Sequence, residues 1–218
     1  MSGLIARRGM MVGAGGKGHN LPPEYQEVEW ISNPYGTNIK FPNPFTMQGW
    51  GIKAKFQVPN NRATYQCCIK GTVTGQADVT YFGVAGNPRK QQIMATRSYV
   101  RSLNEYAEQV ITVAVNYKND GLCTIDGEQA ESVPSLPSIS NVDDFSIFGY
   151  KTYGGCPPVY ELELTVGNEV VMDFIPCYRK SDGARGFYDV KGTIYEPTNS
   201  PLYSNESGDK RYTLGPEV

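Results

Sequence analysis

The sequence predicts an all-β protein in which two antiparallel sheets pack face to face. Apolar and polar residues alternate along several runs, most clearly over Trp50–Val58 and Tyr160–Val166, and a period of two is typical of a half-buried strand. Gly, Asn, Pro and Asp separate these short runs, as they do in β-sandwiches. The 24 Gly and 15 Pro among 218 residues disfavour long helices.

Each further run of this kind predicts one strand. The predicted strands cover residues 25–31, 50–58, 65–70, 79–84, 91–96, 110–117, 122–126, 145–150, 160–166, 170–175, 187–188, 193–195 and 211–214. Asp120-Gly121 predicts a tight hairpin turn, and Gly167-Asn168 predicts another. Pro176 has no backbone N–H, so we expect the strand over 170–175 to end there. Ser102–Gln109 is the best helix candidate, but it is short and poorly amphipathic, and a loop is the alternative.

Residues 1–20 predict an N-terminal arm ahead of one domain over residues 21–218. The apolar residues near the start are interrupted by Arg7 and Arg8, so they are too few for a secretory signal or a membrane helix. A glycine tract follows and favours a flexible terminus. The alternative is an arm that becomes ordered when it docks on a neighbouring protein, through Leu4, Ile5, Arg7, Arg8, Met10 and Met11.

Charge and composition exclude several classes of function. The formal net charge is -2, so no basic field is available to hold nucleic acid. His19 is the only histidine, which argues against histidine triads and histidine-rich metal sites; we expect it to be a solvated linker residue. The five cysteines are odd in number and include no Cys-x-x-Cys pair. We therefore expect reduced, buried thiols and no cofactor.

Two segments at opposite ends of the domain resemble one family. The segment LPPEYQEVEWISNPYGTNI begins at Leu21, and DFIPCYRKSDGARGFYDV begins at Asp173 and is followed by a tail that ends GDKRYTLGPEV. They are similar to the LPEEYQEVEYIESTGTQYI opening and the DFIPCYRKSDGVIGLYDLVNGVFYTN and GTFTKGPEV closing segments of a family of bacteriophage and prophage virion proteins. The resemblance implies a concanavalin A-like, laminin-G-like jelly roll on a phage particle. It also favours the docking interpretation of the arm, because similar proteins begin with a leader that contains Arg-Arg and several Met.

Glu161 and Glu163 are the best candidates for catalysis. They share one face of a predicted strand, and retaining glycosidases need two carboxyl groups about 5–5.5 Å apart. Glucanases with this type of jelly roll carry a third acid on the strand, where this chain has Thr165. A solvated strand face explains both glutamates without chemistry, and we therefore predict that the chain is not an enzyme.

Two other polar groups have a structural explanation as well as a functional one. Asp143-Asp144 could contact calcium but falls far short of a six-ligand site. Arg179, Lys180, Asp182 and Arg185 could contact a sugar or a partner protein. The structural explanation, which we favour, is that Asp182 and Gly183 form an Asx-type turn while the basic residues pair with acids such as Asp173 and Asp189.

Glycan binding would require exposed aromatic rings beside hydrogen-bonding side chains on rim loops. The candidates are Tyr99, Tyr106, Tyr153, Arg89 and Asn104. Packing of tyrosines within the sheets is the alternative, since the chain has 15 of them.

These observations predict a non-enzymatic phage virion protein, part of a fiber, a tail or a capsid decoration. Its arm would bind other virion proteins, and its lectin-like domain would bind glycan on the host surface. We expect it to be a homo-oligomer located in the virion, assembled in the host cytoplasm without nucleic acid or membrane insertion. A free carbohydrate-binding module and a glycoside hydrolase are the alternatives.

Overall fold

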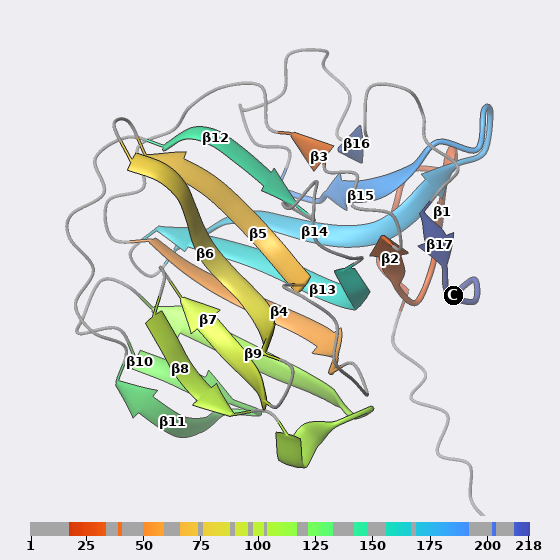
Figure 1. The fold of residues 1–218 in the computed structure, drawn as a ribbon. Coiled ribbons are helices and arrows are strands. Elements are labelled where there is room, and N and C mark those ends of the chain that lie inside the picture. Colours follow the sequence, from red (N-terminus) through yellow and green to blue (C-terminus); the bar gives the residue numbers. More distant parts are fainter. Residues whose placement is uncertain are drawn as a thin grey trace, which may run out of the picture.

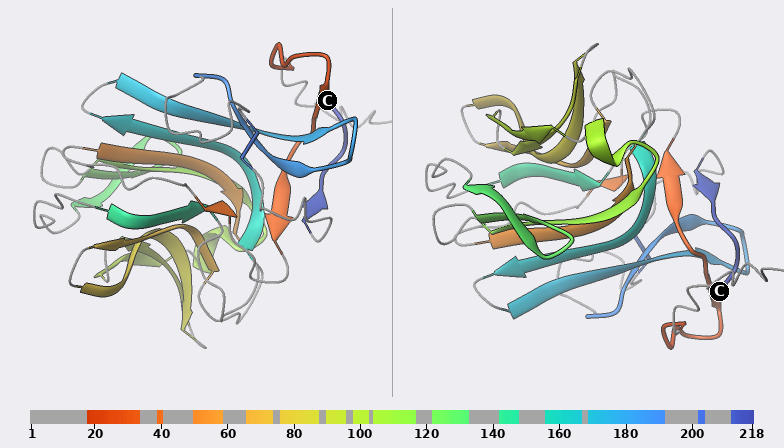
Figure 2. Two further views of the ribbon diagram at one scale, coloured as in Figure 1. Left: turned by 90° about the horizontal axis from the view of Figure 1, so that it is seen from above. Right: turned by 90° about the horizontal axis from the view of Figure 1, so that it is seen from below.

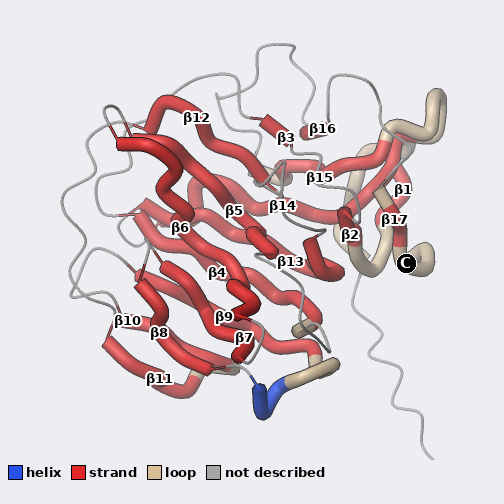
Figure 3. The backbone as a smooth tube through the Cα atoms, viewed as in Figure 1, coloured by secondary structure: helices blue, strands red, loops and turns tan. Residues whose placement is uncertain are grey.

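The chain folds as two antiparallel β-sheets stacked in two layers, as the sequence predicts (Figures 1 and 2). The computed structural model describes residues 18–33, 39–40, 50–58, 66–73, 76–87, 90–95, 98–102, 104–116, 122–132, 142–147, 156–166, 169–191, 202–203 and 212–218, and every structural statement concerns these residues. Among them the one helical element is a 3₁₀ turn (Figure 3). No helix in these segments is long and apolar enough to cross a membrane.

The large sheet contains eleven of the strands. Eight follow one another in the order β11 (Glu128–Ser132), β10 (Leu122–Ile125), β9 (Val110–Asn116), β4 (Trp50–Gln57), β13 (Cys156–Val166), β14 (Glu169–Arg179), β15 (Arg185–Asp189) and β16 (Leu202–Tyr203). Three more join at one end: β1 (Tyr25–Glu27) pairs with β14, β2 (Ile31–Asn33) pairs with β13, and β17 (Thr213–Leu214) pairs with β2. Both chain ends of the domain therefore belong to this sheet.

The small sheet contains six strands and covers one face of the large sheet (Figure 2). Its order is β3 (Ile39–Lys40), β12 (Val142–Ile147), β5 (Gln66–Val73), β6 (Gln76–Asn87), β7 (Lys90–Ala95) and β8 (Ser98–Ser102). The predicted strand over 145–150 thus begins earlier, at Val142, and includes Asp143-Asp144.

The core forms where the alternating apolar residues of the large sheet face the small sheet. The buried residues of the four central strands include Ile52, Ala54, Phe56, Ile111, Val113, Val115, Val159, Leu162, Leu164, Met172 and Phe174. Burying each large apolar side chain contributes about 1.5–3 kcal/mol before entropy is subtracted. Because a shift of one residue would expose a whole set, this pattern also fixes the register of the strands.

The predicted helix over Ser102–Gln109 is instead a single 3₁₀ turn, η1 (Asn104–Tyr106), followed by irregular backbone. Glu108 has a positive φ of 64°, which ends any helical continuation. Its N–H and that of Val58 are nevertheless satisfied, because Glu108 N donates to the Val58 carbonyl and Val58 N donates to the Gln109 carbonyl. The loop alternative was therefore closer to the structure.

The strand that was predicted to end at Pro176 continues to Arg179 as β14. In a strand, the N–H and C=O of one residue point toward the same neighbour. The Pro176 carbonyl accepts from Val28 N at 3.0 Å, so the missing N–H lies on the side where β1 replaces β13 as the partner of β14. The opposite neighbour, β15, pairs with β14 through Phe187 opposite Pro176 without needing that N–H.

The predicted first strand over 25–31 is divided in two. Tyr25, Val28 and Ile31 are all buried, and a spacing of three cannot place them on one face of a single straight strand. The chain leaves β14 after Glu27, forms an isolated bridge between Val28 and Glu217, and joins β13 at Ile31.

The hairpins agree with the predicted pairing. β9 pairs with β10 and β13 pairs with β14, while Asp120-Gly121 and Gly167-Asn168 lie outside the described residues. A tight turn is present at Asp126-Gly127, where φ is 50° and 87°. Two successive positive φ values are typical of the type I′ hairpin turn, and this turn joins β10 to β11.

The structure describes the side chains of two cysteines, and both are reduced thiols. Cys123 and Cys177 are fully buried, as expected for reduced cysteines in a β-sandwich core. Burial raises the pKa of the Cys177 thiol to about 12, so this sulfur is not a nucleophile near neutral pH.

Candidate functional site: the polar face of the large sheet

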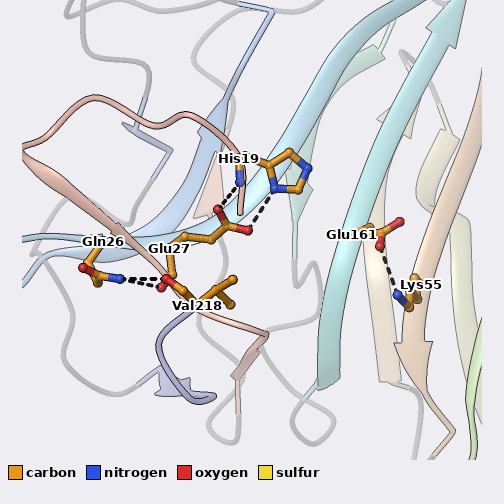
Figure 4. A network of polar contacts seen from close by, with 6 residues as sticks. All are labelled: His19, Gln26, Glu27, Lys55, Glu161 and Val218. Carbon is orange, nitrogen blue, oxygen red and sulfur yellow. Dashed lines mark hydrogen bonds and ion pairs between the residues drawn. The ribbon is translucent and has the colours of Figure 1, made fainter. Parts of the chain in front are cut away.

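The face of the large sheet that points away from the small sheet carries ordered pairs of opposite charges. Lys53 and Lys55 of β4 lie directly opposite Glu163 and Glu161 of β13 in the strand register. Lys53 Nζ lies 2.6 Å from Glu163 Oε1, and Lys55 Nζ lies 3.0 Å from Glu161 Oε1 (the second pair is drawn in Figure 4). The hydrogen bond to Glu163 raises the pKa of Lys53. All four side chains are partly exposed, so each pair adds little to stability.

The two predicted catalytic glutamates therefore each have a lysine partner. They lie two positions apart on one strand, and the acid directly across from Glu163 is Asp173 of β14 rather than Glu161. Burial, followed by the charge of Glu163, raises the pKa of Asp173. A carboxyl group with a raised pKa beside a second carboxyl group is an arrangement used in general acid catalysis.

Asp189 fixes the backbone beside this pair of carboxyl groups. Its side chain is buried, and its Oδ1 accepts hydrogen bonds from Asp173 N at 3.1 Å and Lys191 N at 3.0 Å. Asp189 therefore holds the end of β15 against β14.

His19 is not the solvated linker residue that the sequence suggested. Its Nδ1 lies 2.9 Å from Glu27 Oε1, and its backbone N donates to Glu27 Oε2 at 2.6 Å (Figure 4). The C-terminal residue lies at the same place, since Gln26 Nε2 donates to the Val218 carbonyl and Val218 N donates to the Glu27 carbonyl. The point where the arm joins the domain is therefore beside the C-terminus.

The charged turn between β14 and β15 has the predicted structural role. Asp182 Oδ1 accepts from Ala184 N at 3.1 Å and Gly183 has a φ of 71°, which together form the expected Asx-type turn. Arg179 binds both carboxylate oxygens of Asp182, at 3.0 and 2.6 Å, and this pairing lowers the pKa of Asp182 to about 2.

Two of the basic residues of this turn bind backbone carbonyls. Lys180 Nζ donates to the Pro23 carbonyl at 3.0 Å, and Arg185 donates to the Tyr212 carbonyl. Both acceptors belong to the segments that begin and end the domain. The turn therefore joins β14 and β15 to the two chain ends.

Three of the predicted glycan-binding residues lie in the described part of the chain, and two of them share η1. Tyr106 is half-buried in η1, Asn104 begins η1, and Tyr99 lies in β8. Arg89 and Tyr153 lie outside the described residues, as do the arm residues Leu4, Ile5, Arg7, Arg8, Met10 and Met11. The described residues contain no group of three or more His, Cys, Asp or Glu able to hold a metal ion.

The alternation over Tyr160–Val166 predicted that Tyr160 faces inward with Leu162, and this prediction was wrong because a β-bulge interrupts β13 between Val159 and Glu161. Tyr160 of β13 is partly exposed, and Lys55 Nζ lies 6.0 Å from the centre of its ring. Trp30, just before β2, is also partly exposed and lies against Gly215. No local pattern in the sequence marks either ring, because Tyr160 continues the apolar alternation of Leu162 and Leu164 and Trp30 lies at the break between β1 and β2.

Comparisons with known proteins give no family. No family model and no curated protein matches the chain. The solved structures that match include Trypanosoma rangeli sialidase in complex with sialic acid, with 12% identity and a TM-score of 0.47 over 65% of this chain and 26% of that chain. The same sialidase with the inhibitor DANA matches with 13% identity and a TM-score of 0.43 over 61% of this chain and 24% of that chain. This chain thus spans about a quarter of their length.

These matches correct the prediction that the chain is not an enzyme. The matched structures are sialidases, so the absence of catalysis is no longer assumed. The low identity and TM-scores assign neither a reaction nor a catalytic residue to this chain.

Proposed function

We propose that the chain is a bacteriophage virion protein whose β-sandwich is displayed on the particle and binds host-surface glycan. The observation that supports this proposal is the packing of the two segments that resemble the virion family. β1 pairs with β14, and residues 213–218 run beside residues 27–32. The segments that resemble the family from opposite ends of the sequence thus form one local structure.

A small second core holds this local structure together. Tyr25, Cys177 and Ala184 are buried against one another, and Leu21 and Tyr188 pack on them. The rings of Tyr25 and Tyr188 meet edge to face with centroids 5.0 Å apart, a favoured aromatic geometry. A shared packing unit gives a physical reason for the two segments to occur together, and so supports membership of the resembled family.

In this proposal the arm over residues 1–20 attaches the domain to other virion proteins. Because His19 is bound to Glu27, the decisive truncation removes residues 1–17 and leaves Gly18 and His19 in place. The truncated protein should keep the midpoint of urea unfolding of the full chain and should be missing from purified particles. Incorporation at the level of the full chain would refute the attachment by the arm.

Two variants of the full chain separate the two kinds of arm contact. One replaces Leu4, Ile5, Met10 and Met11 with Ser; the other replaces Arg7 and Arg8 with Ala. Loss of incorporation in the first variant indicates apolar docking, and loss in the second indicates pairing with acidic groups. Normal incorporation of both would contradict the assigned anchoring residues.

A second candidate function is a glycoside hydrolase centred on Glu163 and Asp173. It is favoured by the direct register of the two carboxyl groups and by the raised pKa of Asp173. Asp173 would protonate the leaving oxygen as general acid, with Glu163 as the second carboxylate. Release of reducing ends from host-wall polysaccharide should then be lost in Asp173→Asn and Glu163→Gln. Absence of cleavage by the unmodified chain would eliminate this candidate.

A further inference from the structure

Trp30 and Tyr160 adjoin a paired position of β2 and β13. Ile31 pairs with Val159, and both are fully buried toward the core. Continuing this antiparallel register by one residue sets Trp30 against Tyr160. Both side chains are partly exposed.

The position of the Trp30 indole is set by the C-terminal segment. A Cβ built on Gly215 would lie 2.7 Å from Trp30 Nε1 and 2.8 Å from Cδ1, so the ring rests on backbone that only glycine leaves open. Gly215 N also donates to the Trp30 carbonyl at 2.8 Å. The indole is thereby held in place before any ligand arrives, which lowers the entropic cost of binding.

The position of Tyr160 is set by a β-bulge. Val159 pairs with Phe56 and Glu161 pairs with Lys55, so Tyr160 is an extra residue of β13 between two residues that pair with consecutive residues of β4. Bulges of this kind turn a side chain in a new direction and are frequent beside binding sites. Here the bulge places the Tyr160 ring 6.0 Å from Lys55 Nζ.

Charged groups surround the two rings. Lys55 Nζ pairs with Glu161 Oε1 at 3.0 Å, and Glu29 lies close enough that its charge, together with burial, raises the pKa of Tyr160. One ammonium and two carboxylates offer both donors and acceptors at the edge of an aromatic surface. Their sum is one negative charge, which repels an acidic ligand.

We propose that Trp30, Tyr160, Lys55, Glu161 and Glu29 form a binding site for a neutral pyranose residue of a glycan. The apolar C–H face of the sugar lies on the aromatic rings, and its hydroxyl groups exchange hydrogen bonds with the ammonium and the carboxylates. This site rests on the proposed glycan-binding function and supplies its location. It also sets the ligand class, since sugars that carry a carboxylate are excluded by charge.

The experiment is a titration of the full chain with methyl β-D-glucopyranoside, methyl β-D-galactopyranoside and N-acetylglucosamine, with N-acetylneuraminic acid as the acidic sugar. Binding is followed by saturation-transfer NMR and by tryptophan fluorescence, which reports on Trp30 and Trp50 alone. At least one neutral sugar should bind with a millimolar or lower Kd, and the acidic sugar should bind at least tenfold more weakly.

The neighbouring lysine provides a matched control. Lys53→Met and Lys55→Met remove the same group two residues apart on the same face of β4. Lys55→Met and Trp30→Ala should weaken binding at least tenfold, and Lys53→Met should leave the Kd within twofold. Equal effects of the two lysine variants, or an unchanged Kd in Trp30→Ala, would overturn the site. If Trp30→Ala proves to be unfolded, Trp30→Phe takes its place as the test. This variant keeps a stacking ring and should retain most of the affinity.

The outcomes separate the site from the proposed function. If the unmodified chain binds a neutral sugar and Trp30→Ala binds it equally well, the glycan-binding function stands and this site is wrong. If the unmodified chain binds none of these sugars and no host-wall polysaccharide, both the site and the glycan-binding function are refuted, whereas incorporation into particles is decided by the truncation.

Discussion

Replacing Gly215 with alanine tests the packing that orients Trp30. The new Cβ would lie 2.7, 2.8 and 2.9 Å from three indole atoms, whereas carbon contacts are optimal at about 3.5–4.0 Å. The indole must therefore retreat by roughly 1 Å, and overpacking of this kind costs about 1–3 kcal/mol. Gly215 is not among the glycines with positive φ, so alanine can adopt its backbone conformation. The lower conformational entropy of the unfolded chain with alanine stabilises the protein by about 0.4–1 kcal/mol and offsets part of this cost.

A double-mutant cycle isolates the contact itself. With Trp30 present, Gly215→Ala should lower the free energy of unfolding; in Trp30→Ala, where no indole is left to clash, the same change should be neutral or stabilising by about 0.4–1 kcal/mol. The coupling energy should be about 1–3 kcal/mol. Urea unfolding followed by circular dichroism measures all four proteins. A coupling energy below about 0.5 kcal/mol, the usual error of additivity, would refute the packing of Trp30 on Gly215.

Three further predictions concern the segment from β14 to β15. Because the pKa of Asp173 is raised, the folded state holds a proton that the unfolded state has released just above the ordinary carboxyl pKa of about 3.9. The contribution of Asp173 to stability therefore falls as pH rises through this window. The unfolding free energy of Asp173→Asn minus that of the unmodified chain should accordingly increase from pH 4 to pH 7. A difference that does not change with pH would contradict the raised pKa of Asp173. Phe187→Ala should cost about 3–5 kcal/mol in urea unfolding, since Phe187 is fully buried and meets Phe174 edge to face, and a loss under 1 kcal/mol would contradict its place in the core. Gly183→Ala should cost about 1–2 kcal/mol because of its φ of 71°, and Gly183→Asn should cost less; equal unfolding midpoints for all three proteins would disprove the strained turn.

Strands with one buried face were the part of the fold that the sequence predicted best. Over Trp50–Val58 the alternation names the inward residues, and Ile52, Ala54 and Phe56 are all buried. A period of two follows directly from strand geometry and needs no knowledge of the partner strand. The charged turn at Asp182-Gly183 was predictable for a similar reason, because its hydrogen bonds are local.

Features that depend on the choice of partner strand were not predicted. Pro176 is tolerated inside β14 only because β1 replaces β13 on the side that lacks an N–H, and that exchange is set by the chain ends. The break between β1 and β2 lies at the same exchange of partners, because the chain leaves β14 after β1 and joins β13 through β2. The short edge strands β3 and β16 carry no alternation long enough to be detected.

The candidate site was missed because its residues are distant in sequence. The Lys55–Glu161 and Lys53–Glu163 pairs join residues more than 100 positions apart, and they depend on the register between β4 and β13. Tyr160 is turned toward Lys55 by a bulge that no local pattern announces. The sequence therefore identified the glutamates, but it could not identify the lysines opposite them or the aromatic rings beside them.

The location of the aromatic site limits how the domain can be attached to a particle. Trp30 lies on the C-terminal segment that also meets Gln26 and Glu27, close to the point where the arm joins the domain. A rigid attachment at this end would cover the rings. We therefore expect the proposed attachment through the arm to leave the proposed glycan site at Trp30 open, and attachment through the folded end of the domain to cover it.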